Sequence, residues 1–246
     1  LLLILTGALI GVASATDLFN LWLWFELMVV ATYFLVSFRR DEPLALEATV
    51  KYLVQSTLGS ALVLMGIALM LAQTGTLALD RQMSGGVLDI AGALLLIGFG
   101  VKLALVPLHT WLPDAYSQAP DGVSTLLAGV VTEAGLIALL RALAPLPSFA
   151  VLLLGFGIVN MVVGNLLALR QRDLKRLLAY SSLPHIGYML FGIGIGLSTG
   201  TPDGIRGGLF HLLNHGLMKG LAFLAAGALL YALHRQRGID RPLRID

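Results

Sequence analysis

Apolar residues fall in eight long runs along the chain, and short polar stretches separate them. Most runs hold about 20 residues, the length that an α-helix needs to cross the hydrocarbon core of a bilayer. The pattern therefore predicts an all-α, polytopic membrane protein with about eight transmembrane helices in a single domain, residues 1–246. The expected spans are residues 1–16, 18–38, 48–72, 87–107, 123–143, 149–169, 178–197 and 205–233.

The composition supports a membrane protein and excludes several kinds of site. Hydrophobic residues make up 57% of the 246 residues and charged residues 12%, and the mean hydropathy is +0.88. Soluble domains are about 45–50% apolar and about 25% charged. Cysteine is absent, which rules out disulfides and cysteine-held redox clusters within this sequence. We expect no bound cofactor.

Basic residues gather in the polar segments on one side of the predicted spans. The positive-inside rule places that side, and both ends of the chain, in the cytoplasm. The pI of about 9.1 then reflects orientation in a cytoplasmic (inner) membrane, with lipid rather than nucleic acid as the partner. The opposite side holds only Arg81, Arg141 and Arg206. The basic side, where Leu1 begins, holds Arg39, Arg40, Arg170, Arg172, Lys175, Arg176, Arg235, Arg237, Arg241 and Arg244.

The two ends of the sequence suggest an internal piece of a longer protein. The chain starts at Leu1 with neither an initiator methionine nor the charged segment of a signal peptide. It ends at Asp246 in a polar segment. We therefore expect further helices outside these residues.

A lysine interrupts the fourth apolar run close to two prolines. An ammonium at bilayer depth costs roughly 2.5–3.5 kcal/mol on insertion scales, so Lys102 needs a partner, a water-filled cavity or a function. Pro107 and Pro113 lack backbone donors and break or kink the helix just beyond the charge. The span is expected to continue as a short second piece over residues 108–116. A broken helix beside a buried ionisable group is typical of ion-transfer sites.

Two carboxylates also fall inside predicted spans. Glu26 lies midway along residues 18–38, and Glu133 lies near the middle of residues 123–143. Intramembrane carboxylates are usually functional, although each could serve only as a structural partner. Pairing of Glu26 with Lys102 would let both groups keep their charge and would couple their proton affinities. A short loop joins the fourth and fifth spans, so Glu133 is also expected within reach of Lys102.

A polar stripe follows the eighth span. His211, His215 and Lys219 recur every four residues, which places them on one helix face. Histidine titrates near neutral pH and can pass protons through either ring nitrogen, so the stripe predicts a proton wire. Metal binding is the alternative, but the zinc-protease motif needs a glutamate where Leu212 stands, and we expect no metal.

Other polar groups allow more than one interpretation. Lys51 lies at a span end, where its ammonium can reach the interface. His109 lies at the helix break and can either bond freed carbonyls or relay protons. His185 and the Tyr-Ser-Ser cluster at residues 180–182 can either line a cytoplasmic water inlet or be structural. The tryptophans are expected to pack or to anchor the interface.

Several segments resemble the antiporter-like membrane subunits. They are residues 101–116 (VKLALVPLHTWLPDAY), 173–188 (DLKRLLAYSSLPHIGY) and 211–219 (HLLNHGLMK). The family includes proton-pumping membrane-arm subunits of respiratory complex I, large subunits of Mrp-type sodium/proton antiporters and membrane subunits of energy-converting hydrogenases. Residues 17–26 (DLFNLWLWFE) look closest to the Mrp branch. The resemblance covers essentially the whole chain.

That resemblance implies a fold of about fourteen helices built around two inverted five-helix repeats. This chain would supply helices four to eleven. Residues 1–145 would form the first repeat, and residues 146–246 the truncated start of the second. The second broken helix, with its own ionisable residue, would follow Asp246.

The resemblance also assigns roles to the buried charges. Glu26 matches the family's essential glutamate, and Lys102 matches the lysine at the broken helix. Many members carry lysine where this chain has Glu133, so the middle of its polar axis has a different charge sign. The rest of the axis that joins the two half-channels is matched by His211, His215 and Lys219.

The function expected from these features is proton translocation in a redox-driven membrane complex of the NADH:quinone oxidoreductase or hydrogenase type. The chain would pass protons along buried Glu, Lys and His side chains and would perform no redox chemistry itself. Its partners would be other membrane subunits. The transported ions would be protons and, if the protein is an antiporter, sodium ions as well. The alternative is a subunit of an Mrp-type sodium/proton antiporter. A scaffold that keeps the fold without the path would not need all of these buried charges.

Overall fold

A computed structural model describes residues 1–38, 41–80, 82 and 84–237 of the chain. Of the charges that predict the orientation, Arg39, Arg40, Arg81, Arg241 and Arg244 lie outside these residues. The described chain is built of helices. They are α1 (Leu2–Ser14), α2 (Leu18–Val36), α3 (Pro43–Thr74), α4 (Gly86–Lys102), α5 (Trp111–Gln118), α6 (Asp121–Leu126), the π-helical turn η1 (Leu127–Val131), α7 (Thr132–Leu143), the 3₁₀ turn η2 (Pro147–Phe149), α8 (Ala150–Leu169), α9 (Leu174–Tyr180), α10 (Ser182–Thr199) and α11 (Pro202–Arg237).

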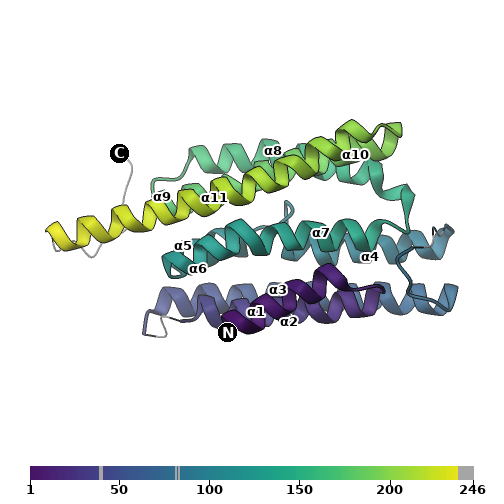
Figure 1. Cartoon of the computed structure of the whole chain (residues 1–246), viewed down its shortest axis with the longest axis horizontal. Helices are drawn as coiled ribbons and strands as arrows, with labels where there is room; N and C mark the ends of the chain where they lie inside the picture. The colour runs from purple at the N-terminus through teal and green to yellow at the C-terminus, as the bar shows by residue number, and fades with distance from the viewer. Residues whose placement is uncertain (39–40, 81, 83, 238–246) are drawn as a thin grey trace.

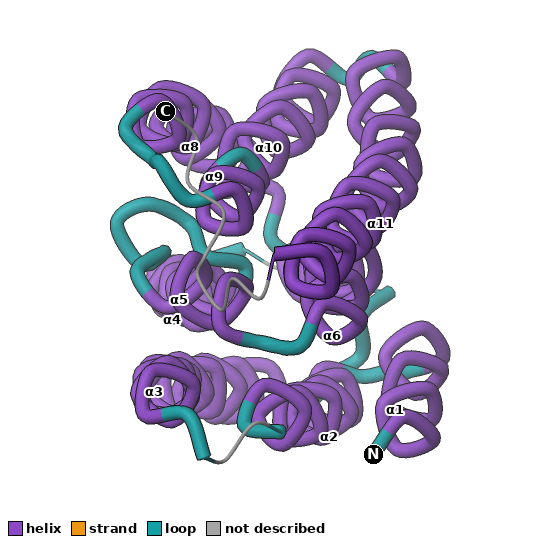
Figure 2. The backbone as a smooth tube through the Cα atoms, turned by 90° about the vertical axis from the view of Figure 1, so that its left-hand side faces the viewer, coloured by secondary structure: helices purple, strands orange, loops and turns teal. Residues whose placement is uncertain are grey.

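The helices lie in three tiers that follow the order of the chain. Helices α1, α2 and α3 form the first tier, α4 to α7 the middle tier, and α8 to α11 the third (Figures 1 and 2). The middle tier packs on both others: α4 against α3 on one side, and α5, α6 and η1 against α9 and α11 on the other. Side chains of the middle tier can therefore meet partners from both halves of the chain.

The lengths of the helices agree with a multi-pass membrane protein. Among the described residues, five helical segments are long and apolar enough to cross a membrane. They are Leu18–Val36, Pro43–Thr74, Asp121–Leu143, Ala150–Leu169 and Pro202–Leu233. Length and hydropathy alone do not confirm the predicted count of eight, since α1 has 13 residues and α4 has 17.

Several helix boundaries differ from the sequence prediction. Helix α3 begins at Pro43 rather than at residue 48, because proline suits the first turn of a helix, where N–H groups have no partner. Helix α4 ends at Lys102 rather than at residue 107. The predicted seventh span is divided at Ser181 into α9 and α10. Pro184 falls in the first turn of α10, where its missing N–H costs no hydrogen bond.

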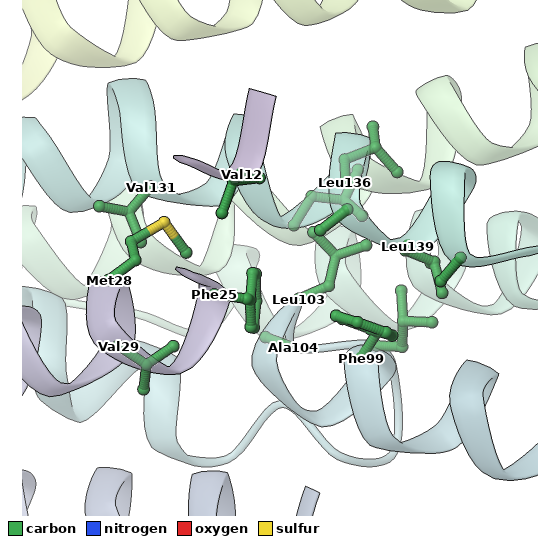
Figure 3. Packing of buried hydrophobic residues seen from close by; sticks show 14 of the residues in the cluster. Val12, Phe25, Met28, Val29, Phe99, Leu103, Ala104, Val131, Leu136 and Leu139 are labelled. Atoms are coloured by element: carbon green, nitrogen blue, oxygen red, sulfur yellow. The ribbon is translucent and has the colours of Figure 1, made fainter. Parts of the chain in front are cut away.

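The core lies chiefly where the first and middle tiers meet. Phe25 of α2 and Phe99 of α4 meet edge to face, with ring centroids 5.2 Å apart. Leu103 and Leu136 lie beside these rings (Figure 3), and all four residues are buried. Because lipid tails are as apolar as leucine, such contacts hold membrane helices together through close packing rather than through the hydrophobic effect.

A row of aromatic rings connects the three tiers. Tyr33 of α2 contacts Tyr52 of α3 edge to face at 4.8 Å, and Tyr52 stacks on Trp111 of α5 at 4.1 Å. Trp111 and Tyr116 follow at 6.4 Å, and Tyr116 meets Phe223 of α11 at 5.9 Å. Short α5 is thus held between α3 and α11.

Arg141 of α7 fixes the end of α1. Its guanidinium donates to the carbonyl oxygens of Val12 at 2.6 Å and Ala13 at 3.0 Å, and also to that of Ala15. The last carbonyls of a helix have no partner within the helix, and the negative end of its dipole favours a cation. Arg141 therefore satisfies backbone groups that lipid could not.

Candidate functional site

The structure brings together Lys102 and Glu26, the two buried charges that the sequence predicts to pair. Lys102 is the last residue of α4, and its side chain is 2% exposed. Its ammonium forms an ion pair with Oε1 of Glu26 in α2, whose side chain is 21% exposed. The ammonium also lies over the ring of Phe25, 4.9 Å from the centroid. Both charges are thus compensated inside the helix bundle.

The chain between α4 and α5 forms the predicted break. Ala104 takes a left-handed conformation with φ of 57° and turns the chain out of α4, and the peptide bond between Val106 and Pro107 is cis. The Val106 N–H donates to Oδ1 of Asn160 in α8 at 2.8 Å. Irregular backbone persists at membrane depth only where such partners replace water.

Trp111 ties the second piece of the broken helix back to the first. Its indole N–H donates to the carbonyl of Val101 at 2.7 Å. Val101 precedes Lys102, so α5 is fixed directly beside the ion pair. The second piece begins at Trp111 rather than at the predicted residue 108.

Glu133 pairs with a histidine rather than with Lys102. Its Oε1 lies 2.5 Å from Nδ1 of His215 in α11. Both residues are buried, His215 completely. This contact joins the middle and third tiers, because η1 and α11 pack against each other; that Glu133 lies within reach of Lys102 stays a prediction.

The polar stripe of α11 faces two different sets of partners. His211 lies 3.0 Å from Nδ1 of His185 in α10, and the His185 ring is 5.2 Å from that of His215. Lys219 donates to the Leu178 carbonyl at 2.9 Å and to the Ser181 hydroxyl. The stripe therefore runs from a histidine cluster to the interruption between α9 and α10.

Two residues near this stripe, His185 and Ser181, make contacts that the sequence did not predict. His185 stacks on His211 with centroids 5.2 Å apart, so it belongs to the histidine cluster. Ser181 lies at the interruption between α9 and α10, and its hydroxyl accepts a hydrogen bond from the ammonium of Lys219. The serines followed by Pro184 were the available signal, because they favour a helix start.

The remaining candidates have structural partners. Lys51 binds Asp114 of α5 at 3.0 Å and Glu47 at 2.7 Å. Trp22 donates to Ser60 at 3.0 Å, which agrees with a packing role. His109 at the break lies edge to face with Tyr180, with centroids 6.4 Å apart.

Salt bridges also join the short helices of the middle tier to α9. Asp114 accepts from Arg176 at 2.9 Å. Lys175 binds Asp121 at 2.9 Å and donates to the Ala119 carbonyl at 2.7 Å. Partly exposed pairs of this kind contribute about 0–1 kcal/mol each, so they fix geometry more than they add stability.

The site as a whole is a series of buried acids and bases that crosses the three tiers. Glu26 and Lys102 form its first pair, Glu133 and His215 its second, and Lys219 its end. Among the described residues no group of three or more histidine and carboxylate side chains is placed to hold a metal ion. When two ionisable groups interact strongly, each step of proton uptake or release is a property of the pair and not of either residue alone. Fold and site together define a multi-pass helical membrane protein with ionisable side chains buried between its helices.

Comparison with known proteins identifies the family. The model described as "NADH:quinone oxidoreductase/Mrp antiporter, TM" matches residues 15–243, and the chain belongs to this family. It is 36% identical over 260 aligned residues to the F(420)H(2) dehydrogenase subunit N of Methanosarcina mazei. That alignment covers 100% of this chain and 52% of the relative, so the chain spans about half the length of that protein.

Solved structures give the same result for the fold. The structure of the membrane-bound sulfane sulfur reductase, an archaeal respiratory membrane complex, matches with a TM-score of 0.83 and 32% identity. The match covers 92% of this chain and 48% of the chain in that structure. The Mrp complex from Dietzia sp. DQ12-45-1b matches with a TM-score of 0.87 and 27% identity, over 99% of this chain and 46% of the other.

Proposed function

We propose that this chain forms part of a proton-translocating, antiporter-like subunit of a redox-driven membrane complex. Lys102 would be the central proton carrier, and Glu26 the acid that tunes its proton affinity. Glu133, His211, His215 and Lys219 would then pass protons sideways through the bundle. Electron transfer would belong to partner subunits.

The ion pair at the broken helix is the observation that carries this proposal. A buried lysine bound to a glutamate from another helix is costly to assemble, and a structural helix contact does not need it. Here Lys102 is the last residue of α4, and hydrogen bonds to Asn160 and Trp111 hold the backbone around the break that follows. Such a site can change protonation without exposing its charges to lipid.

A sodium/proton antiporter subunit is the second candidate. The Mrp complex structure matches 99% of the chain with a TM-score of 0.87, and the same buried axis would serve exchange of protons for sodium. In that case a proton gradient, rather than electron transfer, would drive the ion movement.

The remaining assignments belong to the same proposal. The protein would lie in the cytoplasmic (inner) membrane with both ends of this piece in the cytoplasm, as the loop charges favour. Residues 1–145 would form the first inverted repeat and residues 146–246 the start of the second. Other membrane subunits would complete the complex.

The test is proton uptake by inverted vesicles that contain the full-length protein in its complex. Lys102→Ala is expected to abolish uptake by the complex that assembles, because no other group can take the central position; uptake is therefore compared for equal amounts of assembled complex. Lys51→Ala, which removes a half-exposed lysine outside the path, should keep nearly the wild-type rate. Wild-type uptake with alanine at position 102 would overturn the assignment.

The driving force separates the two candidates in the same vesicles. Proton uptake that requires an electron donor supports the redox-driven complex. Proton movement driven by an imposed sodium gradient without any electron donor supports the antiporter.

A further inference from the structure

The direction in which Glu133 points depends on the π-helical turn that precedes it. The turn η1 lies inside the helical segment formed by α6, η1 and α7, and Glu133 follows it by two residues. A π turn adds one residue, and each residue of an α-helix advances by about 100°, so everything after η1 is rotated by about that angle. Without the turn, Glu133 would face away from His215.

Side-chain hydrogen bonds hold this turn open. The Leu127 carbonyl accepts the N–H of Thr132, five residues on, and also the Thr132 hydroxyl at 2.9 Å. The hydroxyl of Tyr116 lies 3.0 Å from the same carbonyl and 2.5 Å from Oγ1 of Thr132. All three groups are buried. An α-helical turn would not need these extra donors, so they favour the π form.

Tyr116 is itself fixed by the elements that carry the two charge pairs. Its ring meets Phe223 of α11 and Trp111 of α5. Trp111 in turn donates to Val101, the residue before Lys102. The tyrosine hydroxyl is therefore held in place between the broken helix and the helix that carries His215.

The backbone of α11 fits closely against the same turn. A Cβ atom added to Gly129 of η1 would lie 2.9 Å from the carbonyl oxygen of Gly216, the residue after His215. This contact fixes the separation of the two helices but not the rotation of Glu133. The rotation depends on the hydrogen bonds at Leu127.

We infer that Tyr116 is a positioning residue: through Thr132 its hydroxyl fixes the π turn that aims Glu133 at His215. The inference rests on the proposed function in one respect: the expected effect on proton uptake requires that protons pass through Glu133. The geometric part, control of the environment of Glu133, stands apart from any transport. Neither residue needs to titrate for this role.

The experiment removes single hydroxyl groups in the full-length protein within its complex. Tyr116→Phe and Thr132→Val keep ring and volume, and Thr132→Ser keeps the hydroxyl. Tyr52→Phe is the matched control, because Tyr52 is also buried and bonded to a threonine, Thr32, at 2.9 Å. Two quantities are measured: the rate of proton uptake, and the infrared carboxyl signal of Glu133, identified by its loss in Glu133→Gln.

We expect Tyr116→Phe and Thr132→Val each to displace the Glu133 signal and to slow uptake about tenfold, the scale of one buried hydrogen bond. The double variant should be slower than either single by less than the product of the two effects, because the two hydroxyls share one bond. Thr132→Ser and Tyr52→Phe should resemble the wild type. An undisplaced Glu133 signal in Tyr116→Phe would overturn the inference.

The same measurements separate this inference from the proposed function. If Glu133→Gln takes up protons at the wild-type rate, the transport role of Glu133 fails. A displaced signal in Tyr116→Phe would then still support positioning. If Glu133→Gln is slow but Tyr116→Phe leaves both signal and rate unchanged, only the positioning inference fails.

Discussion

Lys102 and Glu26 stabilise each other because each would otherwise be an uncompensated charge among apolar helices. Desolvation costs several kcal/mol for each ion, and mutual attraction offsets that cost only while both are present. The carboxylate and ammonium come from α2 and α4, so the pair also fixes how these helices meet. Loss of one charge should therefore disturb the site more than loss of both.

A double-mutant cycle tests that coupling. Glu26→Gln and Lys102→Gln are each expected to destabilise the assembled protein by about 3–5 kcal/mol, because the partner charge stays buried and unpaired. The double variant should be more stable than either single. Thermal unfolding in detergent gives the four stabilities. The exposed pair Lys51 and Glu47 is the control, with a coupling of about 0–1 kcal/mol. Additive losses at Glu26 and Lys102 would show that the two do not interact.

Glu133 should matter through its ability to take up a proton. Glu133→Gln keeps the shape of the side chain and the hydrogen bond to His215 but cannot titrate, so uptake is expected to slow by about tenfold or more. Glu133→Lys should keep some activity if water restores a path, because many relatives are expected to carry lysine there. Uptake by inverted vesicles at several pH values around neutrality measures both. A wild-type rate with glutamine at every pH would make Glu133 a structural partner.

At the level of residues, the sequence identified the charges but only some of their contacts. Glu26, Lys102 and the stripe of α11 stood out because charges inside apolar runs are rare. The partner of Glu133 could not be predicted, since it depends on how η1 packs on α11. Tyr116 and Thr132 were missed because a neutral hydroxyl carries no charge that would stand out in the sequence.

At the level of helices, two of the three lysines that are buried among the described residues share one arrangement. Lys102 is the last residue of α4. Lys219 comes from α11 but donates to the Leu178 carbonyl near the end of α9. The end of a helix leaves carbonyls without partners and carries a partial negative charge, which favours a cation. A helix end therefore accompanies each of these lysines, in addition to the carboxylate of Glu26 for Lys102 and the hydroxyl of Ser181 for Lys219.

The close contact between η1 and α11 predicts a strong effect of one methyl group. A Cβ atom at position 216 would lie 2.7 Å from the carbonyl oxygen of Gly129, so Gly216→Ala must push the helices apart. We expect a loss of about 1–3 kcal/mol in stability and slower proton uptake, since His215 moves from Glu133. Gly207→Ala in the same helix is the control, because nothing lies within 4 Å of that Cβ. Equal unfolding temperatures for the two variants would contradict the packing.

Helix breaks were predictable where proline causes them and not elsewhere. Pro107 indicated the break after Lys102, although α4 ends five residues before it. The π turn at η1 contains no proline, and one inserted residue barely changes the hydrophobic pattern of a helix buried on several sides. Its position follows from hydrogen bonds to Tyr116, which lies on another element.

For the whole molecule, Asn160 joins the break of the middle tier to the third tier by hydrogen bonds. It is fully buried; its Oδ1 accepts from Val106, and its amide donates to the Leu183 carbonyl of α10 at 3.5 Å. The helix that follows the α9–α10 interruption and the loop that follows Lys102 therefore share one side chain. Movement of either would be transmitted to the other.

Asn160→Leu should loosen this connection. The Val106 N–H would lose its acceptor, which costs about 1–3 kcal/mol for a buried donor, and uptake through Lys102 should slow. Asn165→Leu is the control, since Asn165 lies on the same helix and, within the part of the chain that the structure describes, bonds the Met161 carbonyl of its own turn alone. Its effect on stability should stay within about 0.5 kcal/mol. Thermal unfolding and vesicle uptake are measured for both variants; similar losses would rule out a special role for Asn160.

The sequence predicted the helical membrane class and most spans, but not the tiers. Hydropathy locates helices along the chain and says nothing about which of them touch. The three-tier arrangement depends on contacts such as Asn160 with Val106 and Arg141 with the end of α1, which join residues far apart in sequence. Such polar contacts between helices leave no periodic pattern to detect.

The stacking of Trp111 on Tyr52 makes the broken helix optically observable. This sequence holds three tryptophans; Trp22 and Trp24 are partly exposed on α2, whereas Trp111 is buried beside the ion pair. With every other tryptophan of the protein replaced by phenylalanine, indole emission would come from the joint between α4 and α5 alone. Quenching by the stacked tyrosine and the bond to Val101 would make its lifetime sensitive to small displacements. Movement at the centre of the protein could then be followed in real time without an added label.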